Sequence, residues 1–105
     1  MQVLSESEKL IMSVVWNNPG IKIMDIGKEI KIRFDRNWQP QTVATFITRL
    51  KKKGYVKIER REKDRNTYVF ASISINDYKR EQILEMQNIF FNGNKKEMEK
   101  FIKNM

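Results

Sequence analysis

The apolar side chains of this 105-residue chain change their spacing at Gly54. Before Gly54 they recur every three or four residues, which is the period of amphipathic helices. After it come runs of β-branched and aromatic residues, which favour strands, and from about residue 76 the helical spacing returns. The predicted order is three helices, one hairpin and one or two further helices, a mostly α (α+β) fold class.

Capping and breaking residues place the first two helices. Ser5 and Glu8 fit a capping box, in which each side chain accepts a hydrogen bond from the backbone amide of the other residue. We therefore expect a helix over residues 6–17, ended by the breakers at 17–20. Isoleucines spaced three and four residues apart predict a second, shorter helix over residues 25–31.

The third helix has the clearest limits. It follows Gln39 and begins with Pro40, which is tolerated at a first helical position because the amide there has no helical partner. It ends before Gly54, which supplies a left-handed residue. Its apolar face, which we expect to be core, consists of Val43, Phe46, Ile47 and Leu50.

Two strand-like runs, residues 55–58 and 67–73, flank a polar turn over residues 60–66 and predict a hairpin. Three helices followed by a hairpin are the elements of a winged helix-turn-helix with a two-stranded β wing, which we expect over residues 1–74. Residues 75–105 are expected to form a C-terminal helical dimerisation segment, interrupted at Asn92-Gly93-Asn94.

The outer face of the third helix carries the candidate DNA-binding side chains. No acidic residue lies between Gln39 and Lys53, so phosphates would meet no repulsion there. Amide, hydroxyl and guanidinium groups suit base edges, and cations suit phosphates. An ordinary surface helix is also polar; the neighbouring short helix and basic hairpin favour DNA. The candidates are Gln41, Thr42, Thr45, Thr48, Arg49 and Lys52.

The predicted wing carries a small excess of positive charge. Arg61, Lys63 and Arg65 are candidates for contact with the DNA backbone. The alternative is a solvated hairpin tip whose mixed charges pair across the two strands. Trp16 and Trp38 could in principle stack on bases, but their places on an apolar stripe and before a helix cap favour structural roles.

Composition excludes several function classes. The 21 Lys and Arg exceed the 13 Asp and Glu, giving a net charge of +8, which favours nucleic acid but also suits an anionic membrane surface. The chain has no Cys and no His, so most metal sites and the commonest nucleophile–base pairs are excluded. We expect no enzyme activity, no cofactor and no metal. Neither a signal peptide nor a spanning segment is visible, which predicts a cytoplasmic protein without membrane contact.

The apolar residues of the C-terminal segment need a surface to pack against. A symmetric homodimer would bury them and set two recognition helices at successive major-groove faces. Folding back onto the first domain and lying on a membrane surface are the alternatives. The dimerisation candidates are Tyr78, Leu84, Ile89, Phe90, Met98, Phe101 and Ile102.

Several of these stretches together resemble the penicillinase repressor family (BlaI/MecI type). The resemblance covers the first three quarters of the chain. It rests on Ser5-Glu6-Ser7-Glu8, Ile11-Met12, Val15-Trp16, Trp38-Gln39-Pro40-Gln41-Thr42-Val43, Thr45, Ile47-Thr48-Arg49-Leu50 and Lys52-Lys53-Gly54-Tyr55. It implies a homodimeric winged-helix repressor that binds a palindromic operator. It also implies that Gln41, Thr42, Thr45 and Arg49 meet DNA.

The same resemblance implies a regulatory protease as a possible partner, since family members are inactivated by cleavage in the tail. The nearest counterpart of the cleaved bond here is Lys100–Phe101. Two residues depart from the family: Gln39 replaces the usual serine cap, and Lys9 stands where members usually carry an aromatic residue. Without Cys, the chain lacks the cluster of the copper-sensing branch.

Two functions stay open on the sequence alone. The first is a sequence-specific repressor that reads the major groove with helix 40–53. The second is a winged-helix interaction module whose basic face binds an acidic protein, because a fold does not fix a function. A hydrolase is a distant third, since no nucleophile and base are paired.

Overall fold

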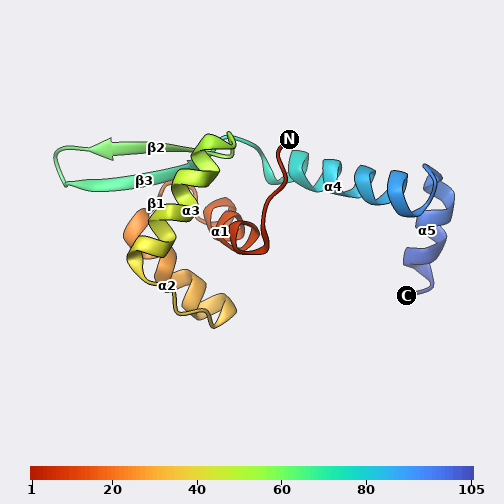
Figure 1. The fold of residues 1–105 in the computed structure, drawn as a ribbon, viewed down its shortest axis with the longest axis horizontal. Coiled ribbons are helices and arrows are strands. Elements are labelled where there is room, and N and C mark those ends of the chain that lie inside the picture. Colours follow the sequence, from red (N-terminus) through yellow and green to blue (C-terminus); the bar gives the residue numbers. More distant parts are fainter. The chain divides into compact units, whose positions relative to one another are not determined.

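The computed structural model describes all residues, 1–105, which form two compact units, residues 1–73 and 74–105. Unit 1 contains α1 (Glu6–Asn17), β1 (Ile21–Lys22), α2 (Ile23–Phe34), α3 (Pro40–Lys52), β2 (Val56–Arg61) and β3 (Asn66–Ala71) (Figure 1). Unit 2 contains α4 (Ile75–Phe90) and α5 (Lys95–Lys103). The three helices followed by an antiparallel hairpin confirm the winged helix-turn-helix.

Local signals explain where the helices of unit 1 begin and end. The Ser5–Glu8 capping box is formed, and α1 covers the predicted residues. Gly54 is left-handed after α3, with φ of 81°. Helix α2 is five residues longer than the 25–31 predicted: it starts after Lys22, which provides no side-chain cap, and ends at the left-handed Asp35. The sequence carried no capping signal there.

The sheet of unit 1 has three strands in the order β1-β3-β2, all antiparallel. The predicted hairpin is confirmed as β2 and β3, with Glu59 opposite Tyr68. The two-residue strand β1 was not predicted, and its Lys22 also lies opposite Tyr68, from the other side of β3. The wing is thus tied to the chain that enters α2.

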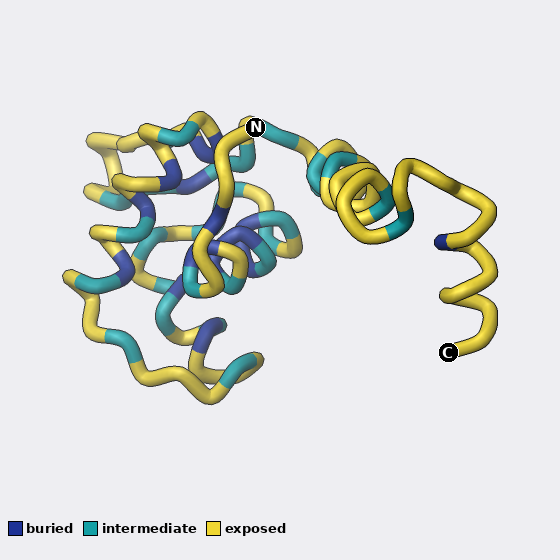
Figure 2. Tube along the Cα trace, turned by 45° about the vertical axis from the view of Figure 1, so that its right-hand side comes forward, coloured by how far each residue is buried: buried dark blue, intermediate teal, exposed yellow.

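The core of unit 1 lies where the three helices meet one face of the sheet, as the buried segments in Figure 2 show. Leu50 of α3, Tyr55 after it and Val69 of β3 are fully buried. Trp16 is half-buried rather than core, and its indole N–H donates to the carbonyl of Ile73 at 2.8 Å. This bond explains why a tryptophan lies at the edge, since a buried indole needs an acceptor.

Unit 2 is two helices joined by a tight turn with few buried side chains. Ser74 caps α4 by accepting from the Asp77 amide, so this helix begins earlier than the predicted residues 76–77. Met98 is 7% exposed, whereas no residue of α4 is buried. The rings of Phe91 and Phe101 lie 5.6 Å apart. No helix in the structure has both the length and the apolar character needed to cross a membrane.

Candidate nucleic-acid interface

Helix α3 presents a row of polar side chains to solvent. Gln41, Thr45, Thr48 and Lys52 are spaced four, three and four residues apart, which places them along one face, and all four are exposed. Arg49 beside them is exposed as well, whereas Thr42 is half-buried. The structure therefore brings five of the six predicted α3 residues together on an open surface.

The threonines of this row have a defined hydrogen-bonding state. The Thr45 hydroxyl donates to the carbonyl of Gln41 at 2.9 Å, and the Thr48 hydroxyl donates to the carbonyl of Ala44 at 3.0 Å. A hydroxyl has one proton and two lone pairs, so each oxygen keeps acceptor capacity. These side chains therefore offer outward an acceptor for a base amino group and a methyl for thymine.

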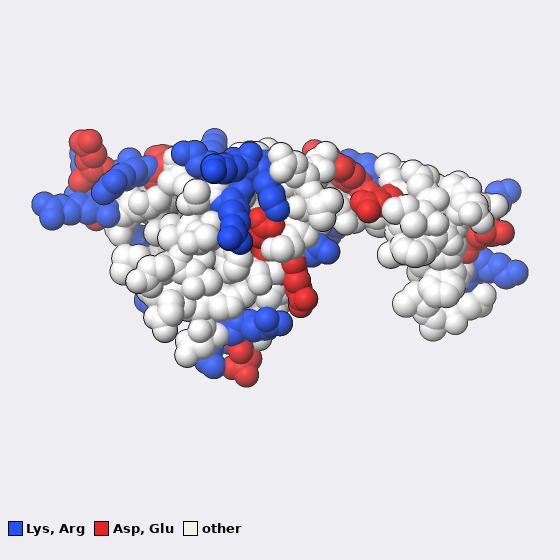
Figure 3. Space-filling view, in the orientation of Figure 1, with Lys and Arg blue, Asp and Glu red and all other residues white.

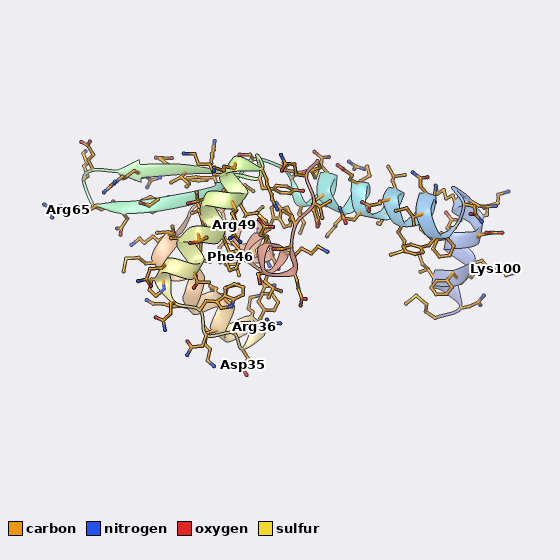
Figure 4. The ribbon with its side chains drawn as sticks, in the orientation of Figure 1. Asp35, Arg36, Phe46, Arg49, Arg65 and Lys100 are labelled. Atoms are coloured by element: carbon orange, nitrogen blue, oxygen red, sulfur yellow. The ribbon has the colours of Figure 1, made fainter.

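Arg49 lies on an aromatic support. Its guanidinium carbon is 5.8 Å from the centre of the Phe46 ring, and that ring is 5.3 Å from the Trp38 ring (Figure 4). Val43, Ile47 and Leu50 are buried as predicted, whereas Phe46 is only half-buried. It lies at the border between core and surface, where its ring contacts both Trp38 and the Arg49 guanidinium.

The three lysines at the end of α3 do not share one role. Lys51 and Lys52 are exposed. The Lys53 ammonium instead donates to the Glu8 carboxylate at 2.7 Å and to the carbonyl of Val3 at 2.9 Å. Sequence reasoning missed this pair because 45 residues separate its members, although an acid on the apolar stripe of α1 could have suggested a partner.

Glu8 is the one buried charged residue of the chain, at 2% exposure. Burial raises its pKa, but the hydrogen bond from Lys53, those from Ser5 and the nearby Lys53 charge together lower it more. The pKa of Glu8 therefore lies below its ordinary value of 4.5. The carboxylate stays ionised and holds the start of α1 to the end of α3.

The wing projects from unit 1, with Arg65 at its tip (Figure 4). Arg61, Lys63 and Arg65 are all exposed. Arg61 is engaged within the wing, since its Nε donates to Glu59 of the same strand at 3.1 Å. Figure 3 shows Lys and Arg over the hairpin and the C-terminal end of α3, and uncharged surface over the N-terminal half of α3.

No group of three or more acidic, His or Cys side chains is placed to hold a metal ion. The surface of unit 1 around α3 is a polar helix face bordered by cations.

A family model described as the penicillinase repressor matches residues 4–105, almost the whole chain. This chain belongs to the penicillinase repressor family. The family resemblance predicted from the residues is thereby confirmed, and the match includes unit 2, where the sequence alone followed the family only loosely.

Individual members of the penicillinase repressor family show how far the likeness extends. The methicillin resistance regulatory protein MecI of Mammaliicoccus sciuri is 33% identical over 70 residues, which are 67% of this chain and 53% of MecI. The chain therefore spans about half of that relative. The penicillinase repressor of Bacillus licheniformis is 29% identical over 91 residues, 86% of this chain and 67% of that protein.

A solved structure has a similar fold over most of the chain. The solution structure of the Bacillus licheniformis BlaI monomeric form in complex with the blaP half-operator has a TM-score of 0.59 and 27% identity. The similarity covers 73% of this chain and 89% of that one.

Proposed function

We propose that this chain is a sequence-specific, DNA-binding transcriptional repressor whose helix α3 enters the major groove. The observation that carries the proposal is the acid-free outer face of α3, on which an amide, two hydroxyls and a guanidinium are exposed within a winged-helix frame. The complex of BlaI with a half-operator supports it, because a similar chain of the same family binds DNA.

Within the interface, we assign base contacts and phosphate contacts to different residues. We assign base contacts to Gln41, Thr45, Thr48 and Arg49, which extend from the first turn of α3 to its third. Lys52 lies at the end of the row, where a flexible ammonium suits the backbone. Thr42 is half-buried, so we expect it to contact DNA through at most part of its side chain. We assign Arg61, Lys63 and Arg65 of the wing to contacts with the phosphate backbone of DNA.

The test is binding of the full chain to the DNA upstream of its own gene, compared with random duplex of the same length. Arg49→Ala should cost about 1–3 kcal/mol on the preferred sequence and reduce the preference, whereas Lys52→Ala should weaken binding to both duplexes alike. Lys100→Ala, which removes the same charge from α5, is the matched control. Equal affinity for both duplexes refutes sequence-specific binding, and no binding at low salt favours the protein-interaction module.

We propose further that the repressor acts as a homodimer formed through unit 2. The α4–α5 pair encloses an open apolar hollow of about 420 Å³, lined by residues that include Ile83, Met86 and Phe101. Other apolar side chains of unit 2 are half or more exposed, which supports a partner surface. They include Leu84, Ile89, Phe90 and Ile102. Met98 and the half-buried Tyr78 contribute less open surface.

Sedimentation equilibrium tests the dimer. Phe101→Glu places a charge in the apolar surface and should shift the wild-type dimer to monomer, while Lys100→Ala should leave it dimeric. A wild-type chain that stays monomeric at all accessible concentrations contradicts the proposal.

The proposed activity involves no reaction, so we infer that the chain is not an enzyme and that it acts in the cytoplasm, where bacterial DNA lies.

A regulatory protease remains a proposed partner. The Lys100–Phe101 bond lies inside α5, and proteases cleave locally opened chain. We therefore expect cleavage there to require unfolding of α5, which limited proteolysis followed by mass spectrometry would detect.

A further inference from the structure

The tip of the wing is organised by one carboxylate. Asp64 lies in the turn between β2 and β3, and one of its oxygens accepts from the Asn66 amide at 3.0 Å. Its other oxygen accepts from the hydroxyl of Tyr68, two residues further along β3. Between these bonds Arg65 adopts a left-handed backbone with φ of 58°. Both oxygens of Asp64 are thus used to shape the turn.

Tyr68 connects this turn to Arg61 of the wing. The guanidinium carbon of Arg61 lies 4.2 Å from the centre of the Tyr68 ring, close enough for a cation–π contact. Glu59, directly opposite Tyr68 in the sheet, accepts from Arg61 on the same face. The Tyr68 side chain is therefore held at its hydroxyl by Asp64 and covered on its ring by Arg61.

The pKa directions agree with this arrangement. The hydrogen bond from Tyr68, followed by that from the Asn66 amide, lowers the pKa of Asp64. The same hydrogen bond to Asp64 raises the pKa of Tyr68. Asp64 therefore stays ionised and Tyr68 stays protonated at neutral pH, which is the pairing that the hydrogen bond requires.

Three arginines, Arg60, Arg61 and Arg65, line an open hollow at the tip together with Glu62. The two acids of this region differ in their contacts. Asp64 is engaged through both oxygens, whereas Glu62 is exposed and makes no hydrogen bond or ion pair. Next to a phosphate, either acid would be repulsive by charge alone.

We propose that Asp64 is a positioning residue for DNA binding, which acts through Tyr68 to hold the arginines of the wing tip toward the phosphate backbone. The inference rests on the proposed DNA-binding function. It makes a prediction opposite to that of simple electrostatics: removing the negative charge of Asp64 weakens DNA binding, while removing that of Glu62 strengthens it. When the turn opens, Arg61 loses the support of the Tyr68 ring and Arg65 loses its left-handed backbone position. Ordering them again on DNA costs conformational entropy.

The test measures affinity of the full chain for a fluorescent random-sequence duplex over a series of salt concentrations. The slope of log Kd against log salt counts the phosphates neutralised, and it is insensitive to a lower fraction of folded protein. Asp64→Ala should weaken binding about threefold or more and reduce the slope by about one. Glu62→Ala should tighten binding and leave the slope unchanged or steeper.

Tyr68→Phe tests the same arrangement without changing any charge. It keeps the ring beneath Arg61 and every charge on the wing, and it deletes only the hydroxyl bonded to Asp64. It should reproduce the smaller slope of Asp64→Ala in a milder form. A thermal melt of each variant should match the wild type, since the tip lies outside the core.

The proposal is overturned if Asp64→Ala binds as tightly as Glu62→Ala, or if Tyr68→Phe keeps the wild-type slope. Failure of the proposed function gives a different result: the wild-type chain then shows no salt-dependent binding to any duplex. The random duplex also separates this inference from sequence preference, because wing contacts to phosphates do not depend on sequence.

Discussion

The buried pair of Glu8 and Lys53 allows a quantitative prediction for Lys53→Met. The variant leaves a carboxylate at 2% exposure with only the Ser5 amide, at 2.8 Å, on the oxygen that Lys53 had shared. The other carboxylate oxygen has no hydrogen-bond partner even in the wild type. Removing one member of a buried ion pair costs about 3–5 kcal/mol.

The cost expected here is at the low end of that range or below it. The Lys53 side chain is 26% exposed, so solvent already screens part of the pair. We expect Lys53→Met to reduce the free energy of unfolding by about 2–3 kcal/mol, which in a domain of this size lowers Tm by about 10–20 °C. Lys52→Met is the matched control: it removes the same charge from an exposed neighbour and should change stability by less than about 0.5 kcal/mol.

Urea denaturation followed by tryptophan fluorescence suits this measurement. Both tryptophans, Trp16 and Trp38, belong to unit 1, so the signal reports on that unit. Adding Glu8→Gln to Lys53→Met should recover part of the loss, because the double variant no longer buries an unpaired charge.

The pH dependence provides a second check. The pKa of Glu8 is lowered in the folded state, so the pair stabilises the protein above the unfolded value, near 4.5. This stabilisation is lost as the pH falls through the lower folded pKa. The difference between wild type and Lys53→Met should therefore shrink below pH 4.5. The reasoning is wrong if Lys53→Met costs no more than Lys52→Met, or if its cost is the same at every pH.

Two further predictions follow from local geometry. Gly54→Ala should cost about 1 kcal/mol of stability, because φ is 81° although the added methyl meets open space. Gly20→Ala should cost more, since φ is 74° and the added Cβ would also lie 3.0 Å from the Phe70 ring. Equal costs of the two substitutions in thermal melts would contradict the steric argument. Phe46→Leu should weaken DNA binding about threefold by removing the ring beneath Arg49, and unchanged affinity in a titration would show that the ring does not support the cation.

The sequence predicted those features of the fold that have a local cause. Ser5, Pro40 and Gly54 act within a few residues, and the elements that they limit were predicted closely. The face of α3 followed from helical spacing alone. Features that depend on distant residues could not be predicted: the Glu8–Lys53 pair joins two helices, and the wing turn around Asp64 depends on a hydroxyl from β3.

The exposed fraction of individual apolar side chains could not be predicted from the sequence either. Phe46 and Trp16 belong to apolar stripes, and periodicity does not distinguish the centre of such a stripe from its edge. Their partial exposure follows from the packing of neighbouring elements, which a one-dimensional pattern does not contain. The strand β1 was missed because two residues are too short for any alternation to appear.

That short strand gives unit 1 a mechanical property. Strand β1 passes directly into α2 and pairs with β3 at Tyr68 and Val69. It therefore connects the β2–β3 hairpin to the pair of helices α2 and α3. A force that rotates the hairpin therefore also acts on the start of α2. Helix α2 in turn packs against α3. On the proposed DNA-binding function, we therefore expect a rotation of the hairpin to be transmitted to α2, so that the wing and the helices change position together.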